Sequence, residues 1–130
     1  MPAKKILIIE DDRDIVNLVK LTLELEGFEA FAAFDGQEGW ERIESQRPDS
    51  ILLDLRLPKL DGFQVLKRLK SNQATSRIPI VILTATAQKK SIARGLAAGA
   101  DAYITKPFEP LELVQKICQV LKAKKGRGNE

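Results

Sequence analysis

Residues 6–12 read ILIIEDD, four apolar residues that run directly into three acids. Like charges side by side repel one another, and an apolar run that ends in acids cannot simply be sealed inside a core. Four apolar residues without polar alternation are typical of a strand covered on both faces, as in a parallel sheet. The acids therefore stand where a buried strand ends, and the rest of the sequence decides what they do there.

Short apolar runs of this kind recur along the chain, separated by segments with helical spacing. Strands are predicted at 6–9, 28–34, 50–54, 78–84 and 102–105. Helices are predicted at about 14–25, 36–46, 63–69, 88–97 and 110–122, where apolar residues recur every three or four positions. This alternation, with right-handed crossovers, predicts an α/β fold, a doubly wound (βα)5 sandwich around a five-stranded parallel sheet.

Length and composition suit one globular domain. The 130 residues are 44% apolar and 30% charged, which is typical of a soluble protein. No apolar run approaches the roughly 18 residues of a membrane span, and acids end the first run too early for a signal peptide. We therefore expect a cytoplasmic protein. The single cysteine, Cys118, excludes an internal disulfide, and its apolar-periodic surroundings predict a buried thiol.

The net charge of +3 is concentrated at the C-terminus. Residues 122–130 contain four basic residues and one acid, so that residues 1–121 are neutral overall. A basic segment this short is weak evidence for binding to nucleic acid. We predict one domain over 1–121 and a short, basic, disordered tail over 122–130, with no direct contact to nucleic acid or membrane.

Polar residues follow four of the five predicted strands. They are Glu10-Asp11-Asp12, Asp54, Thr84 and Thr105-Lys106-Pro107. In doubly wound sheets, ligands bind beyond the carboxyl ends of the strands, which is where these residues fall. Converging carboxylates select a hard divalent cation, Mg2+ with Mn2+ as the alternative, while Lys106 and Thr84 supply a positive charge and a hydroxyl. The set suits a phosphoryl group, with a carboxylate as the nucleophile. Asp12 is interpreted instead as a helix cap.

Four segments resemble the receiver domain of two-component response regulators. They are Glu10-Asp11, LLDLRLPKLDG (52–62), PIVILTA (79–85) and GADAYITKPF (99–108), in the order and spacing of that family. The resemblance covers residues 5–121. It implies a flavodoxin-like fold with strand order 2-1-3-4-5, and a protein that accepts a phosphoryl group on an aspartate.

The resemblance also implies a role for each residue of the predicted phosphoryl site. Asp54 would be the phosphoacceptor, and Lys106 would pair with it and then with the phosphate. Asp11 would bind Mg2+ directly together with Asp54 and the backbone carbonyl of Arg56. Glu10 would assist through a water molecule, to which its longer side chain is suited.

A second group of residues would respond to phosphorylation. Thr84 would bond a phosphoryl oxygen in the active state, and Tyr103 would be the aromatic switch that accompanies it. The peptide bond before Pro107 would be cis. Arg56 and Thr86 would tune the lifetime of the acyl phosphate.

The implied partners follow from the same chemistry. The phosphoryl donor would be a sensor histidine kinase or a phosphotransfer protein, and it must act in trans because the chain has no histidine. Catalysis would be limited to the protein's own phosphotransfer and dephosphorylation, so we do not expect an enzyme in the usual sense. The output protein stays unidentified, and we expect a monomer or a weak phosphorylation-dependent dimer.

The segment KPFEPLEL (106–113) resembles the winged-helix transcription-factor subfamily, so the chain has a second reading as the receiver half of a DNA-binding regulator. Asp101, Glu112 and Lys116 fit the pattern of that subfamily's dimer surface. Ile92 and Ala102 stand where charged residues are usual. These departures favour a stand-alone receiver, such as a phosphorelay shuttle.

Two enzyme-like or ligand-binding readings are less well supported. An aspartyl-nucleophile phosphohydrolase of the haloacid-dehalogenase type would have an acid where Arg56 stands. A flavin- or nucleotide-binding module would have a Gly- or Ser/Thr-rich loop where the chain has EDDRD (10–14), which repels phosphate in the absence of a metal.

Overall fold

A computed structural model describes residues 3–57, 59–85 and 89–128. Strands and helices alternate along the chain, as the sequence predicts. In chain order they are β1 (Lys5–Ile9), α1 (Arg13–Leu25), β2 (Glu29–Ala33), α2 (Gly36–Gln46), β3 (Ser50–Asp54), α3 (Gly62–Ser71), β4 (Ile80–Ala85), α4 (Lys89–Ala97), β5 (Ala102–Lys106) and α5 (Pro110–Gly128).

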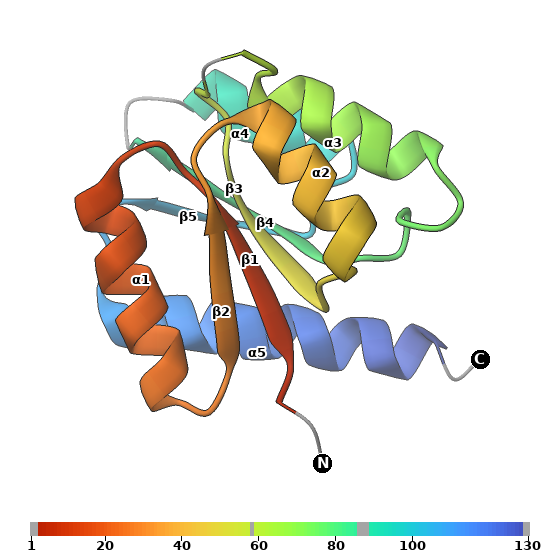
Figure 1. Cartoon of the computed structure of the whole chain (residues 1–130). Helices are drawn as coiled ribbons and strands as arrows, with labels where there is room; N and C mark the ends of the chain where they lie inside the picture. Colours follow the sequence, from red (N-terminus) through yellow and green to blue (C-terminus); the bar gives the residue numbers. More distant parts are fainter. Residues whose placement is uncertain (1–2, 58, 86–88, 129–130) are drawn as a thin grey trace.

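The five strands form one parallel sheet in the order β2-β1-β3-β4-β5. Figure 1 shows α1 and α5 on one face of this sheet and α2, α3 and α4 on the other. The predicted doubly wound α/β sandwich and its strand order are therefore confirmed. The central strands β1 and β3 are almost entirely buried, which is why their sequences are apolar without alternation.

Alternate residues of the strands feed two separate cores. In β1, Ile6 and Ile8 join the core under α1 and α5, whereas Leu7 and Ile9 join the core under α2 and α3. This follows from the period of two in a strand, which sends successive side chains to opposite faces. Both cores are built mainly from buried aliphatic side chains, so the sheet is held rigidly on both faces.

Aspartates begin three of the helices. The side chain of Asp12 accepts hydrogen bonds from the backbone N–H groups of Asp14 and Ile15 and caps α1, as predicted. Asp35 caps α2 and Asp61 caps α3 in the same way. Each cap satisfies backbone donors that have no partner within the helix.

Two details of α5 differ from the sequence predictions. Cys118 is exposed and not buried, because the buried stripe of α5 is formed by Leu113, Ile117 and Val120, and Cys118 is turned by about 100° from Ile117. The helix also continues to Gly128, past its predicted end near Lys122. Lysine and alanine, which dominate residues 122–125, are good helix formers. The division into a domain over 1–121 and a tail over 122–130 stays a prediction.

The start of α3 packs directly on the end of β3. The backbone N–H of Gly62 donates to the carbonyl of Leu55 at 3.2 Å. A Cβ atom at Gly62 would lie 2.5 Å from both the carbonyl oxygen of Asp54 and the Cα of Leu55. These are backbone atoms, so only glycine lets α3 approach the end of β3 this closely.

We expect Gly62→Ala to lower the free energy of unfolding by about 1–3 kcal/mol, because the new methyl group must displace the backbone of β3. Urea denaturation measures the loss. Gly39→Ala is the matched control, since its Cβ would meet the flexible end of the Ile9 side chain, 2.7 Å away, and alanine favours the helix. Equal losses in the two variants would contradict this account of Gly62.

Candidate functional site

Two acids meet at the carboxyl ends of adjacent strands. β1 and β3 are neighbours with Ile9 paired to Leu53, so Glu10 and Asp54, each one residue further on, come to lie side by side. Both are buried, with Glu10 0% and Asp54 6% exposed. Two buried carboxylates that lie side by side repel one another unless a cation neutralises them.

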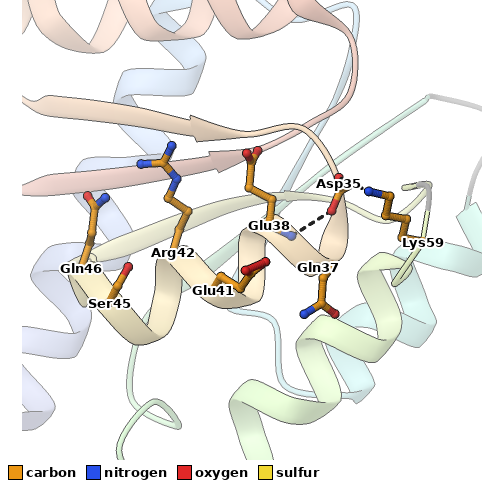
Figure 2. Close-up of a pocket in the computed structure, with 8 residues that line it drawn as sticks. All are labelled: Asp35, Gln37, Glu38, Glu41, Arg42, Ser45, Gln46 and Lys59. Carbon is orange, nitrogen blue, oxygen red and sulfur yellow. Dashed lines mark hydrogen bonds and ion pairs between the residues drawn. The ribbon is translucent and has the colours of Figure 1, made fainter.

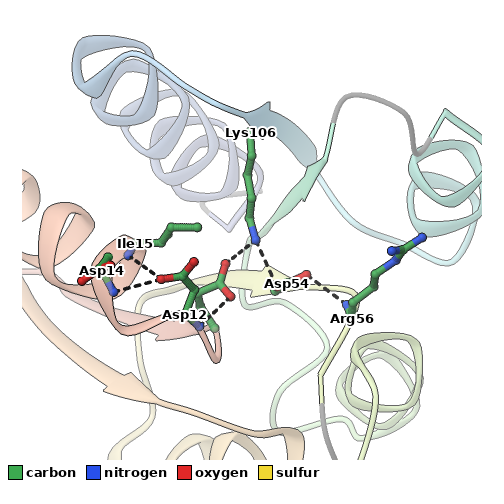
Figure 3. Close-up of polar contacts among 7 residues, drawn as sticks. Asp12, Asp14, Ile15, Asp54, Arg56 and Lys106 are labelled. Carbon is green, nitrogen blue, oxygen red and sulfur yellow. Dashed lines mark hydrogen bonds and ion pairs between the residues drawn. The ribbon is translucent and has the colours of Figure 1, made fainter.

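Lys106 supplies the positive charge from the end of β5. Figure 3 shows its side chain extending from that strand toward Asp54. Its Nζ lies 3.1 Å from Asp54 Oδ2, to which it donates a hydrogen bond, and 2.5 Å from Glu10 Oε1. The contact to Glu10 is an ion pair. One ammonium therefore faces two carboxylates.

This imbalance changes the proton affinities of the site. Burial raises the pKa of Glu10 from 4.5 to about 7, and the proximity of Asp54 adds to the effect, while Lys106 opposes it. Burial lowers the pKa of Lys106, but Glu10 and Asp54 outweigh that effect and leave the pKa above its ordinary value of 10.5. Lys106 therefore stays positively charged. Glu10 is the group that more readily loses its proton when further positive charge enters the site.

A third acid completes a set of metal ligands. Glu10, Asp11 and Asp54 each offer a carboxylate oxygen, and the three oxygens all lie within 4.8 Å of one another. Asp11 is exposed, so a cation could reach the cluster from solvent. Hard, partly exposed carboxylates with room for water suit Mg2+. The donor set therefore fits the cation that the sequence predicts.

Asp12, the last acid of the ILIIEDD stretch, has a separate role. Asp12 directs its carboxylate to the start of α1, as the dashed lines to Asp14 and Ile15 in Figure 3 show. Its backbone N–H donates to Glu10 Oε2 at 3.1 Å, which helps to orient the buried carboxylate. Asp12 thus supports the cluster through its backbone, and its side chain serves the helix.

The other predicted site residues surround this cluster. The backbone N–H of Arg56 donates to Asp54 Oδ1 at 3.0 Å, while its exposed side chain points away from Asp54 in Figure 3. Thr84 is 4% exposed near the end of β4, and Tyr103 is 41% exposed on β5. The Lys106–Pro107 peptide bond is cis. Thr86 lies outside the described residues, and the roles predicted for all of these residues stay predictions.

Thr84 and Tyr103 share one face of the sheet. Tyr103 is paired with Ile82 across β4 and β5, and Ile82 and Thr84 are two residues apart on the same strand. Their side chains therefore project to the same side. Ile82 belongs to the core under α2 and α3 and contacts Gly95 of α4, so this is the face that α4 covers.

Sequence reasoning found only some of the residues that surround the solvent-exposed side of the cluster. A hollow of about 550 Å3 is lined by Asp11 and Arg56 together with Leu55, Leu57, Asp61, Phe63 and Ser91. Its walls come from the loop after β3 and from the starts of α3 and α4, which are distant in sequence from Asp11. The turn residues of LPKLDG (57–62) were the sequence signal of a constrained loop here.

A second hollow lies over α2 and serves no evident chemistry. It has a volume of about 530 Å3, and Figure 2 shows its lining side chains along α2, with Lys59 approaching Asp35. Those two side chains form an ion pair at 3.6 Å. The lining residues include none of Glu10, Asp11, Asp54 and Lys106, so this hollow is separate from the acidic cluster.

Comparisons with known proteins agree with this geometry. The family model described as "Response regulator receiver domain" matches residues 6–118. The chain belongs to the response regulator receiver family. A putative response regulator from Chloroflexus aurantiacus J-10-fl has a similar structure, with a TM-score of 0.89 and 34% identity over 92% of this chain and 98% of that one. The CheY-like receiver domain protein of Methanospirillum hungatei JF-1 gives 0.88 and 33% over 96% and 98%.

Two curated relatives of the receiver are longer proteins. The chain is 41% identical to the alkaline phosphatase synthesis transcriptional regulatory protein PhoP of Bacillus subtilis, over 92% of this chain and 49% of that protein. It is 42% identical to the phosphate regulon transcriptional regulatory protein PhoB of Escherichia coli K12, over 92% and 52%. The chain thus spans about half the length of the curated relatives it matches. Among the residues that the structure describes, no helix has the length and apolar character needed to cross a bilayer.

The raised pKa of Glu10 predicts how the stability of the metal-free receiver depends on pH. The folded state binds this proton more tightly than the unfolded chain, in which the pKa is near 4.5. The contribution of Glu10 to the free energy of unfolding is therefore largest below pH 4.5 and is lost as the pH rises through about 7. The full shift corresponds to at most about 3 kcal/mol.

Glu10→Gln removes the titrating group. We expect the variant to gain stability relative to the wild type as the pH rises from 4.5 to 7, in urea denaturation with EDTA present. Glu44→Gln, at an exposed position on α2, controls for the loss of one negative charge. If the difference in the free energy of unfolding between Glu10→Gln and the wild type stays constant across this pH range, the pKa of Glu10 is not raised.

Proposed function

We propose that this receiver takes a phosphoryl group from a phosphohistidine of a sensor histidine kinase or phosphotransfer protein onto Asp54. The observation that carries the proposal is the convergence of Glu10, Asp11 and Asp54 with Lys106 in a member of the receiver family. Three carboxylates around one ammonium form a site with an excess of negative charge. Such a site suits a divalent cation followed by a phosphoryl group.

Asp11 and Asp54 would hold Mg2+, with Glu10 assisting through water and the backbone carbonyl of Arg56 as a further ligand. When bound, the ion would supply positive charge that offsets the charge on the phosphoryl oxygens. The fit rests on the three carboxylate oxygens within 4.8 Å and on the raised pKa of Glu10, which marks a site short of positive charge.

The chain's own residues account for the transfer itself. A carboxylate oxygen of Asp54 attacks phosphorus and forms the new O–P bond as the P–N bond of the donor phosphoimidazole breaks. The electron pair of that bond leaves with the imidazole nitrogen, which takes up a proton from solvent. Lys106 stays protonated, as its raised pKa requires, and can move from the carboxylate to a phosphoryl oxygen. The backbone N–H of Arg56 holds the other oxygen of Asp54 in place.

The response to phosphorylation would use the face that Thr84 and Tyr103 share. Thr84 would turn toward the phosphoryl group, and Tyr103 would move into the space that it leaves. The 41% exposure of Tyr103 supports this idea, because a partly exposed aromatic ring gains burial by moving inward. The altered surface of α4, β5 and α5 would then bind the output partner. Arg56 and Thr86 would set the lifetime of the acyl phosphate.

The second candidate is the receiver half of a DNA-binding regulator. It is favoured by the similarity to PhoP and PhoB, which are named as transcriptional regulatory proteins, and by the fact that the chain covers only about half the length of each. Ile92 and Ala102 on the α4–β5 surface remain the argument for a stand-alone receiver. Both contexts use the same phosphoryl site.

Asp54→Asn is expected to abolish phosphorylation, because an amide is a poor nucleophile and cannot form the acyl phosphate. Incubation with acetyl phosphate and Mg2+, followed by intact-mass spectrometry, measures the phosphate taken up. Asp12→Asn is the matched control and should be phosphorylated as the wild type is, since asparagine also caps helices well. An Asp54→Asn protein that still gained one Mg2+-dependent phosphate would show that the phosphoacceptor is another residue.

The two neighbouring acids should differ in their effect on Mg2+. Asp11→Asn removes a direct ligand and should weaken Mg2+ binding by more than about tenfold, or roughly 1.4 kcal/mol. Asp12→Asn should leave the affinity nearly unchanged, because that carboxylate is occupied by the start of α1. Isothermal calorimetry of both variants measures the affinities. The reverse order of effects would exchange the roles assigned to these two acids.

A further inference from the structure

A groove between α3 and α4 lies beyond the phosphoryl site. It has a volume of about 460 Å3 and is lined by Phe63, Lys67, Lys70, Ser71, Arg94 and Ala98. Phe63 also lines the hollow next to Asp11, so the groove begins where that hollow ends. We call it the α3–α4 groove. Its lining combines cationic side chains with an aromatic ring and a methyl group.

The charges of the chain are strongly segregated. Residues 62–100, which include α3, β4 and α4, contain seven lysines and arginines and no acid. Residues 10–49, which include α1, β2 and α2, contain twelve acids and four basic residues. The neutrality of residues 1–121 therefore conceals a basic part and an acidic part. A field of this kind attracts an acidic partner to α3 and α4 and repels it from α1 and α2.

The charge that a ligand would meet in the groove comes from Lys67 and Arg94. Lys67 is exposed on α3. The guanidinium of Arg94 stacks over the ring of Phe63 at 3.8 Å, which fixes it in place and leaves its N–H edge suited to a planar carboxylate. Lys70 is engaged with its own chain, where its Nζ donates to the carbonyl of Ser76 at 3.1 Å. It contributes to the field and is not needed as a direct contact.

We propose that the α3–α4 groove docks an acidic peptide segment of a partner protein. Carboxylates of the segment pair with Lys67 and Arg94, and one apolar side chain of the segment packs against Ala98 and the part of Phe63 that Arg94 leaves exposed. A carboxylate can form two parallel hydrogen bonds with the guanidinium of arginine. The apolar part of the lining adds to binding only if the ligand buries an apolar group against it.

Two other occupants fit less well. A base of a single-stranded nucleic acid would stack on an aromatic face, but Arg94 already covers the ring of Phe63. A second copy could offer its acidic part to this groove, but the two surfaces differ, so the contact would be head-to-tail and would build rings or open chains of molecules. A peptide segment meets neither obstacle.

The proposal goes beyond phosphoryl transfer and does not depend on it. No residue of the groove is a predicted metal ligand or phosphate contact. Asp54→Asn should therefore bind the segment as the wild type does, and loss of one activity leaves the other measurable.

Three fluorescein-labelled peptides of equal length test the groove. The first is rich in Glu and Asp around a central Phe, the second has Gly in place of the Phe, and the third has Lys in place of the acids. Fluorescence anisotropy at low and high salt gives the affinities, and amide chemical-shift changes give the location. We expect the acidic Phe peptide to bind most tightly, to weaken with salt, and to shift the amides of α3 and α4.

Variants then separate the groove from general attraction. Lys67→Glu should weaken the acidic Phe peptide by at least about tenfold, and Arg94→Lys, which keeps the charge but loses the bidentate edge, by less. Lys20→Glu, at an exposed position on α1, should have little effect. Circular dichroism confirms that each variant is folded.

Four results would overturn the proposal. They are equal binding of the acidic and basic peptides, no binding of the acidic Phe peptide, shifts confined to other elements, or equal weakening by Lys67→Glu and Lys20→Glu. A single-stranded oligonucleotide that bound more tightly at the same residues and displaced the peptide would replace it with a nucleic-acid site.

Discussion

The structure depends on the fixed register between two buried strands. Because Ile9 is paired with Leu53, the acids that follow β1 and end β3 cannot move apart without breaking the ladder between these strands. Lys106 must then reach across from β5 to balance them. The apolar cores on both faces of the sheet supply the stability that keeps this arrangement together, since the raised pKa of Glu10 means that ionising this buried carboxylate, as the pH rises through about 7, destabilises the fold.

Much of this could be read from the amino-acid sequence. Short apolar runs predicted the strands, and the acids, threonine and lysine at their ends predicted one shared rim. The pattern could not predict that Glu10 would be fully buried and Asp11 exposed, because these depend on how neighbouring loops close around the strand ends. The predicted burial of Cys118 was wrong for another reason. The apolar residues at 113, 114, 117, 120 and 121 define one stripe of the helix centred near Ile117, and Cys118 lies about 100° from that centre, so the helical period already places it outside the stripe.

The segregation of charge was also hidden from a simple count. Summed over residues 1–121 the chain is neutral, yet helices on the same face of the sheet belong to opposite parts of the charge distribution, with α2 in the acidic segment and α3 and α4 in the basic one. Such a molecule orients in the field of another protein even though residues 1–121 carry no net charge. Its encounters with partners should thus depend on ionic strength more than a neutral domain suggests.

The contact between Arg68 and Trp40 has a practical consequence. The guanidinium of Arg68 on α3 lies 5.7 Å from the ring centre of Trp40 on α2, and Trp40 is the single tryptophan of the chain. Tryptophan emission therefore originates from the contact between these two helices, on the face of the sheet opposite α1 and α5. Tryptophan fluorescence from this protein therefore reports how α2 and α3 pack against one another. A change at α1 or α5 alters this fluorescence only if it is transmitted through the sheet.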